Sequence, residues 1–84
     1  MINSEIIRKI TIGSDLKNAM TYQLGSVVNG GKYKITTIFL DPKDFAFFGA
    51  MVYKVCCREG DGPEFVWQSF KDFDNLRIEY VKAD

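Results

Sequence analysis

Short β-type runs separated by turn-forming residues constrain this chain more than any other feature. Runs rich in isoleucine, valine and aromatic residues occupy residues 5–12, 27–28, 32–40, 47–58, 65–70 and 76–81. β-Branched and aromatic residues favour extended backbone, and the glycine, asparagine, aspartate and proline residues between the runs favour tight turns. Because strands joined by short connections are usually neighbours in space, the pattern predicts an antiparallel meander of five to six strands.

Three connections carry the turn signals. Residues 29–31 (NGG) are the strongest, because asparagine and glycine adopt positive φ at low cost. Residues 41–44 (DPKD) place a proline where its fixed φ suits the first central position of a turn. Residues 59–62 (EGDG) predict a further hairpin loop.

The stretch from Ile10 to Gly31 departs from the strand pattern and predicts a short helix. Gly13 ends the first run, and Ser14 or Asp15 can cap a helix by accepting an unpaired backbone N–H. Gly25 suits the position that ends it. One stripe then recurs at three- and four-residue spacing, formed by Leu16, Ala19, Met20 and Gln23. The expected fold is α+β but mostly β: a curled antiparallel meander of five to six strands, with one short helix after the first strand.

The size of the chain predicts a single domain, residues 1–84. A chain of 84 residues has a core near the lower limit for independent stability. Seven Phe, four Tyr and one Trp exceed what a sheet with one solvated face needs, which favours an apolar surface for self-association or for a partner. A homo-oligomer is therefore left open.

Charge and hydropathy argue against two kinds of partner, nucleic acid bound nonspecifically and a membrane. Eleven basic and eleven acidic residues give a net charge of zero, which argues against a strong nonspecific nucleic-acid binder. No apolar run approaches the roughly 20 residues of a membrane helix, and the first residues lack the pattern of a secretory signal. We expect a cytoplasmic protein, in the host cytoplasm if it is phage-encoded, with no membrane partner.

The sequence offers little for catalysis. It contains no histidine, and its paired carboxylates lie in predicted turns, where aspartate serves local backbone hydrogen bonds. Phosphate-binding glycine loops are absent. Cys56 and Cys57 are adjacent on a predicted strand, so we expect one in the core and one partly exposed, both reduced. We therefore expect no enzyme activity, no cofactor and no metal site.

A basic face is the first candidate binding surface. If the connection at 41–44 pairs its flanking strands about its centre, Lys32 lies opposite Lys54. Lys34 and Arg58 then share that face.

Trp67 would add an aromatic ring to this face. If the loop at 59–62 is an even-length connection, Trp67 lies opposite Lys54 and Phe65 joins the same face. Cations beside aromatic rings suit nucleotides, single-stranded nucleic acid or an acidic protein. A one-residue slip would instead turn Trp67 into the core and leave an ordinary solvated lysine face.

The predicted helix gives the second candidate. Asp15, Lys17, Asn18 and Tyr22 could converge on a ligand at the helix N-terminus, where Gly13 allows close backbone approach. The alternative is a capped amphipathic helix with Tyr22 in the core and Lys17 in solvent.

Three short motifs resemble small accessory proteins of phages and prophages. They are I-G-x-D-x-K-N-A-M-x-Y-x-x-G at residues 12–25, W-x-x-F at 67–70 and I-E-Y at 78–80. The resemblance spans most of the chain and transfers no functional residue. It implies a phage-encoded protein that acts stoichiometrically, by blocking a host factor or capturing a defence signal.

Three hypotheses follow from these observations. The first is a non-enzymatic binding protein that blocks a host protein or sequesters a small nucleotide-like ligand. The second is a small barrel-like nucleic-acid-binding domain that uses the basic and aromatic face. The third is a structural or assembly component whose exposed aromatic residues form a subunit interface.

Overall fold

The fold is mostly β. The computed structural model describes residues 5–13, 19–44, 49–72 and 75–82. One 3-10 turn, η1, spans Pro42–Asp44, and no helix in the described ranges is long and apolar enough to cross a membrane. The described residues form seven strands: β1 (Glu5–Ile12), β2 (Met20–Gln23), β3 (Val27–Val28), β4 (Tyr33–Asp41), β5 (Val52–Arg58), β6 (Phe65–Lys71) and β7 (Leu76–Lys82).

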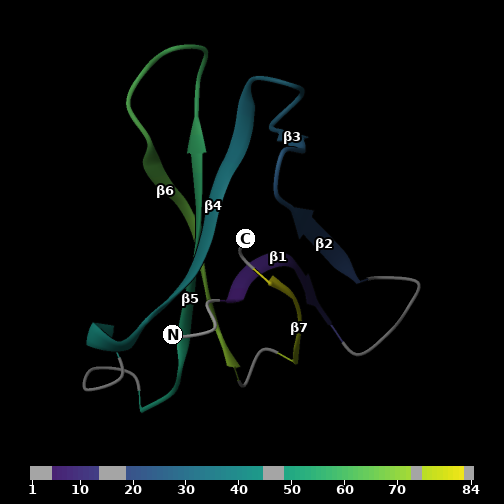
Figure 1. Ribbon diagram of the computed structural model, residues 1–84, viewed down its shortest axis with the longest axis vertical. Helices are drawn as coiled ribbons and strands as arrows, with labels where there is room; N and C mark the ends of the chain where they lie inside the picture. Colours follow the sequence, from purple (N-terminus) through teal and green to yellow (C-terminus); the bar gives the residue numbers. More distant parts are fainter. Residues whose placement is uncertain (1–4, 14–18, 45–48, 73–74, 83–84) are drawn as a thin grey trace.

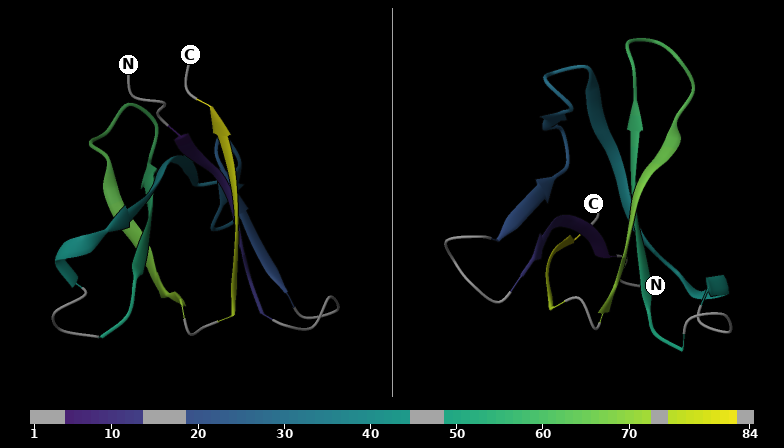
Figure 2. Two further views of the ribbon diagram at one scale, coloured as in Figure 1. Left: turned by 60° about the horizontal axis from the view of Figure 1, so that its bottom comes forward. Right: turned by 180° about the vertical axis from the view of Figure 1, so that it is seen from behind.

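The strands form two curled antiparallel sheets that face each other (Figures 1 and 2). One sheet has the order β2-β1-β7, and the other has the order β3-β4-β5-β6. The second sheet is an antiparallel meander, as predicted, but it has four strands instead of the expected five to six. The first sheet is not a meander, because the last strand returns to pair with the first, from Glu5–Lys82 to Ile12–Leu76.

One extended segment joins the two sheets. The backbone N–H of Leu24 donates to Arg8 O of β1 at 2.9 Å, which continues the β1-β2 ladder. The next N–H, of Gly25, donates to Ile35 O of β4 at 2.9 Å, and Ile35 donates back to Ser26 O at 2.8 Å. Gly25 has a φ of +85°, which favours glycine. This turn of the backbone passes the segment from one sheet to the other.

The hairpin predicted at residues 29–31 is confirmed. Val28 pairs with Tyr33, and Asn29 has a φ of 55°. The N–H of Gly31 donates to Val28 O at 3.2 Å. Residues 29–32 therefore form the connection between β3 and β4.

The predicted helix is wrong for the residues that the structure describes. Met20–Gln23 is strand β2, and it pairs with β1 from Lys9–Gln23 to Ile12–Met20. The three- and four-residue spacing that suggested a helix is outweighed by this ladder, which gives β1 a hydrogen-bonding partner on its second edge. The remaining part of the expected helix, at residues 14–18, lies outside the described residues.

The core lies between the two sheets. Isoleucines of both sheets pack together with two β5 side chains, and the buried cluster consists of Ile7, Ile10, Ile35, Ile38, Val55 and Cys57. Leu76 and Ile78, at alternate positions of β7, pack against it. Tyr80, at the next alternate position of the strand, is 45% exposed.

Tyr22 connects β2 with β6 across the interior. Its ring lies edge-on to Trp67 at 5.4 Å between centroids, and it stacks on Phe70 at 5.5 Å. Aromatic pairs in these geometries stabilise a fold beyond the area that they bury. A second contact links β5 with β7, where Tyr53 lies close to Tyr80. Burial, followed by the interactions with Tyr80, raises the pKa of Tyr53.

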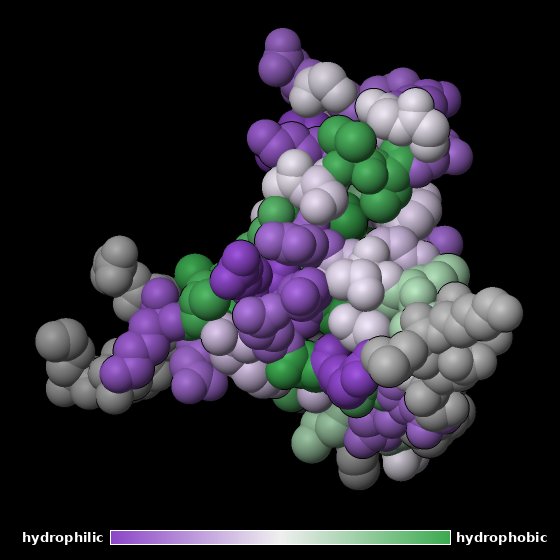
Figure 3. Space-filling view, turned by 90° about the vertical axis from the view of Figure 1, so that its right-hand side faces the viewer, coloured by the Kyte–Doolittle hydropathy of each residue, from purple (hydrophilic) through white to green (hydrophobic). Residues whose placement is uncertain are grey.

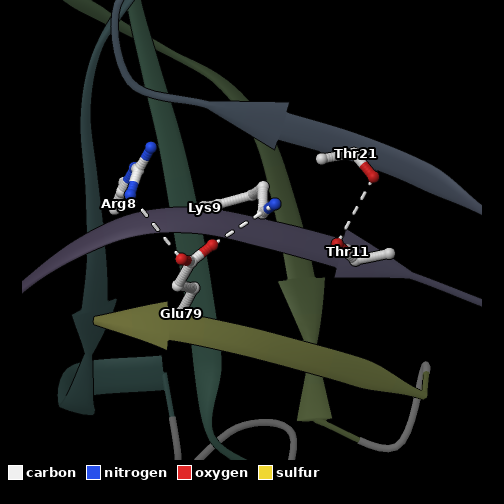
Figure 4. A network of polar contacts seen from close by, with 5 residues as sticks. All are labelled: Arg8, Lys9, Thr11, Thr21 and Glu79. Carbon is white, nitrogen blue, oxygen red and sulfur yellow. Dashed lines mark hydrogen bonds and ion pairs between the residues drawn. The ribbon is translucent and has the colours of Figure 1, made fainter. Parts of the chain in front are cut away.

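The outer face of the β2-β1-β7 sheet is polar (Figure 4). Glu79 of β7 forms ion pairs with Arg8 at 3.7 Å and with Lys9 at 3.3 Å. Thr11 and Thr21 share a hydrogen bond of 3.3 Å between β1 and β2. These side chains are solvent-exposed, and exposed ion pairs contribute about 0–1 kcal/mol each, so the core carries the stability of this sheet.

We predict that Ile10→Ala destabilises the protein by about 2–5 kcal/mol, the range for truncating a buried isoleucine. Ile10 is fully buried between the sheets, whereas Ile6 on the same strand is 43% exposed. Ile6→Ala is therefore the matched control and should cost less than half as much. Urea unfolding, followed by Trp67 fluorescence, measures both. Equal losses would contradict this account of the core.

Candidate functional site

A basic hollow of about 530 Å³ lies where β3, β4 and β5 meet the segment that joins the two sheets. Three cations line it, together with glycines of the surrounding turns, and no Asp or Glu is among its described lining residues. Its lining includes Gly25, Gly31, Lys32, Lys34, Thr36, Arg58 and Gly60. We call this site the basic hollow.

Strand pairing fixes two of the cations side by side. Val27 of β3 pairs with Lys34 of β4, and Lys34 pairs with Arg58 of β5. The three side chains therefore form one row across the sheet. Like charges directly opposite each other on neighbouring strands repel, so this row stores unfavourable electrostatic energy that a bound anion would relieve.

Lys32 adds a third positive charge from the β3-β4 connection. Its Nζ lies 3.8 Å from Glu59 and 5.6 Å from the centre of the Tyr33 ring. Both ion-pair partners are more than half exposed, so this contact is weak and can be exchanged for a ligand. Lys34, by contrast, has no ion-pair partner within the part of the chain that the structure describes.

A carboxylate stands beside the basic hollow. Thr36, which lines the hollow, donates a hydrogen bond to Glu64 Oε2, and Thr37 donates to the same oxygen at 2.8 Å. The hydrogen bond from Thr36, then that from Thr37, holds the pKa of Glu64 below its usual range, and the charge of Arg58 lowers it further. Glu64 is consequently an ionised, positioned hydrogen-bond acceptor.

Glu64 is not among the residues that the sequence pattern indicated. It lies just before β6, in a connection where acidic residues usually serve solubility. Its position depends on the bulge in β4 between Ile35 and Thr37, which brings two consecutive threonines toward it. The two adjacent threonines in the predicted strand were the one sequence feature that could have pointed to this hydrogen-bonded site.

The structure brings together part of the predicted basic face. Lys32, Lys34 and Arg58 line one hollow, but Lys54 does not line it. The expected pairing of Lys32 with Lys54 is wrong, since Lys54 lies opposite Phe39 on β4. The cause is the connection between β4 and β5, which spans residues 42–51 rather than a turn at 41–44 and so shifts the register.

Trp67 does not join this face. Lys54 pairs with Ser69 of β6, and a bulge between the pairs Val55–Gln68 and Cys56–Val66 leaves Trp67 without a direct partner. The ring packs against the core and Tyr22. The expected pairing of Trp67 with Lys54 is therefore wrong. Cys57 pairs with Phe65, which is one residue away from the register of an even-length loop, and the bulge shifts the register by one more.

The second predicted site is not assembled as expected. Asp15, Lys17 and Asn18 lie outside the described residues. Tyr22 lies on strand β2 with its ring between Trp67 and Phe70, so it belongs to the aromatic core rather than to a helix face.

Both cysteines are buried and free, so the expectation of one partly exposed thiol is wrong. Cys57 belongs to the core cluster, and Cys56, its neighbour on the strand, is 4% exposed. Burial raises the pKa of both thiols; the Glu64 charge adds to the effect on Cys56, and Cys56 adds to the effect on Cys57.

A second, apolar hollow of about 350 Å³ lies along β1, β4 and β7. Its lining includes Ile6, Phe39, Leu40 and Tyr80, and Glu5 is its single charged residue among those described. The side of the molecule with β2 and β3 shows hydrophilic residues among residues of intermediate hydropathy, with hydrophobic residues in separate groups (Figure 3). The concentration of positive charge distinguishes the basic hollow from the apolar one.

Comparison with known proteins gives no relative from which a role could be transferred. No protein-family model matches the chain, and neither the curated proteins nor the solved structures contain a significant match. Among the described residues, no three His, Cys, Asp or Glu side chains are grouped so that they could hold a metal ion.

We predict that both thiols react slowly with iodoacetamide in the folded protein, at least about tenfold more slowly than in urea, because burial disfavours the thiolate. The raised thiol pKa values also make the stability of the fold depend on pH. The unfolded chain loses its thiol protons first, so stability should fall as the pH rises above the ordinary value of 9.0.

Urea midpoints on either side of that pH measure the effect. Tyr53 shifts in the same direction, so Tyr53→Phe, which keeps the ring, separates its contribution. Stability that rises over this range would contradict the assignment.

We predict that native Trp67 emits at shorter wavelength than in urea and that single-stranded DNA leaves its emission unchanged, because its ring is engaged by Tyr22 and the core. Fluorescence titration measures both. Quenching by DNA in the folded state would contradict this placement.

Proposed function

We propose that this chain is a non-enzymatic binding protein that sequesters a small, nucleotide-like ligand in the basic hollow. The observation that carries the proposal is the row formed by Lys34 and Arg58 on neighbouring strands, with Lys32 beside it and no acidic residue among the described lining. Phosphate groups are the natural partner of such a cluster, since arginine and lysine donate charge-assisted hydrogen bonds to them.

The charge arrangement supports a local anion site rather than a general one. The chain as a whole carries no net charge, so its attraction for distant polyanions is weak. Three cations around one hollow concentrate positive potential there, and like-charge repulsion between Lys34 and Arg58 makes binding of an anion more favourable.

The shape of the hollow supports a small ligand. A volume of about 530 Å³ falls within the roughly 300–1,000 Å³ of small-molecule sites. Gly25, Gly31 and Gly60 line it, and a Cβ built on any of them would meet no atom within 4 Å. Backbone at these positions is therefore open to a ligand.

This support favours the small ligand over single-stranded nucleic acid. The nucleic-acid alternative uses the Trp67 ring as the stacking surface beside the cations, and Trp67 packs instead on the core. In the phage setting that the sequence resemblance implies, stoichiometric capture would remove a host signal. The remaining alternatives, a bound host protein and an assembly role, are tested by pull-down from host lysate and by mass in solution.

We predict that calorimetric titration at low salt detects binding of ATP, a cyclic dinucleotide or inorganic pyrophosphate, and that added salt weakens it. Lys34→Gln and Arg58→Gln should each reduce the affinity about tenfold, because each removes one charge-assisted hydrogen bond worth about 1.5–3 kcal/mol when fully formed.

Lys43→Gln is the control, since it removes the same charge from η1, away from the hollow. It should leave the affinity unchanged. The proposal is overturned if none of the three probes binds, or if Lys43→Gln weakens binding as much as Arg58→Gln does.

A further inference from the structure

We infer that Glu64 is a specificity-determining residue that selects ribonucleotides among phosphorylated ligands, by accepting hydrogen bonds from the ribose hydroxyls. This inference rests on the proposed function, because it assigns a ligand class to the basic hollow. Glu64 would contact the neutral ribose of the ligand, while the cations contact its phosphate groups.

The carboxylate is held at the side of the hollow. Thr36 forms part of the wall and donates to Glu64 Oε2, so the carboxylate is one hydrogen bond away from the space a ligand would occupy. Thr37 donates to the same oxygen from the neighbouring position of β4. Two donors on one oxygen fix the orientation of a side chain that would otherwise rotate freely.

The second carboxylate oxygen is the acceptor offered to a ligand. Both threonine hydrogen bonds go to Oε2, and no described residue donates to Oε1. An ionised carboxylate accepts hydrogen bonds through both oxygens and donates none. Oε1 therefore suits a ligand hydroxyl rather than a second phosphate, which it would repel.

Arg58 relates the two parts of the site. Its charge acts on Glu64, but the ion pairs of the described residues involve other partners, so Arg58 is not neutralised by direct contact with this carboxylate. A positive group for phosphate and an acceptor for hydroxyls thus occur on one side of the sheet. A ribonucleotide carries both matching groups, whereas inorganic phosphate carries only one.

Comparison of ATP with dATP, which lacks the 2′-hydroxyl, tests the inference. The wild type should bind ATP about tenfold more tightly than dATP. Glu64→Gln keeps the size of the side chain but removes its charge, and should reduce this ratio to near one. Thr37→Val, which removes one of the two hydrogen bonds that orient the carboxylate and leaves the lining of the hollow unchanged, should lower the ratio less.

Pyrophosphate separates the possible failures. If the wild type binds none of the three compounds, the proposed function itself fails. If it binds all three but shows no preference for ATP over dATP, the inference fails and the anion site stands. Glu64→Gln could also strengthen the binding of all three compounds by the same factor and leave the ratio of ATP to dATP affinity unchanged. In that case Glu64 acts only as a repelling charge, and the inference is overturned.

Discussion

The structure depends on one extended segment, residues 20–28, that pairs with both sheets. Its first part forms β2 beside β1, and its last part forms β3 beside β4. The transfer occurs at Gly25, whose N–H donates to Ile35 O. Because the sheets are joined here, isoleucines of β1 face isoleucines of β4, and the core closes between them.

The same crossing creates the basic hollow. The segment contributes Gly25 and Val27 to one side of the hollow, while β4 and β5 contribute Lys34 and Arg58. The backbone ladder holds these two cations opposite each other despite their repulsion, since the ladder depends on backbone hydrogen bonds that the side chains do not supply. Unfavourable charge placement is thus maintained by the fold.

The net charge of zero gives no sign that positive charges gather at the basic hollow. The acidic residues that balance the sequence are not among the described lining of the hollow, and two of them stand at its margin as acceptors, Glu59 for Lys32 and Glu64 for two threonines. Mixed charge around one hollow is suited to a ligand with both anionic and hydroxyl groups. Composition alone argued against strong nonspecific polyanion binding and did not indicate a local anion site.

Residue types by themselves determined the mostly β fold, the hairpin at residues 29–31 and most strand positions, because extended-backbone preference and turn chemistry are local properties. Tertiary structure alone decided the secondary structure of residues 20–23, where pairing with β1 overrode helical spacing. It also decided the partners of Lys54 and Trp67, since bulges and the length of the 42–51 connection set register. Register is a property of two paired strands. The sequence therefore indicated which basic residues line the hollow, but it could not indicate which residues lie opposite them on the neighbouring strands.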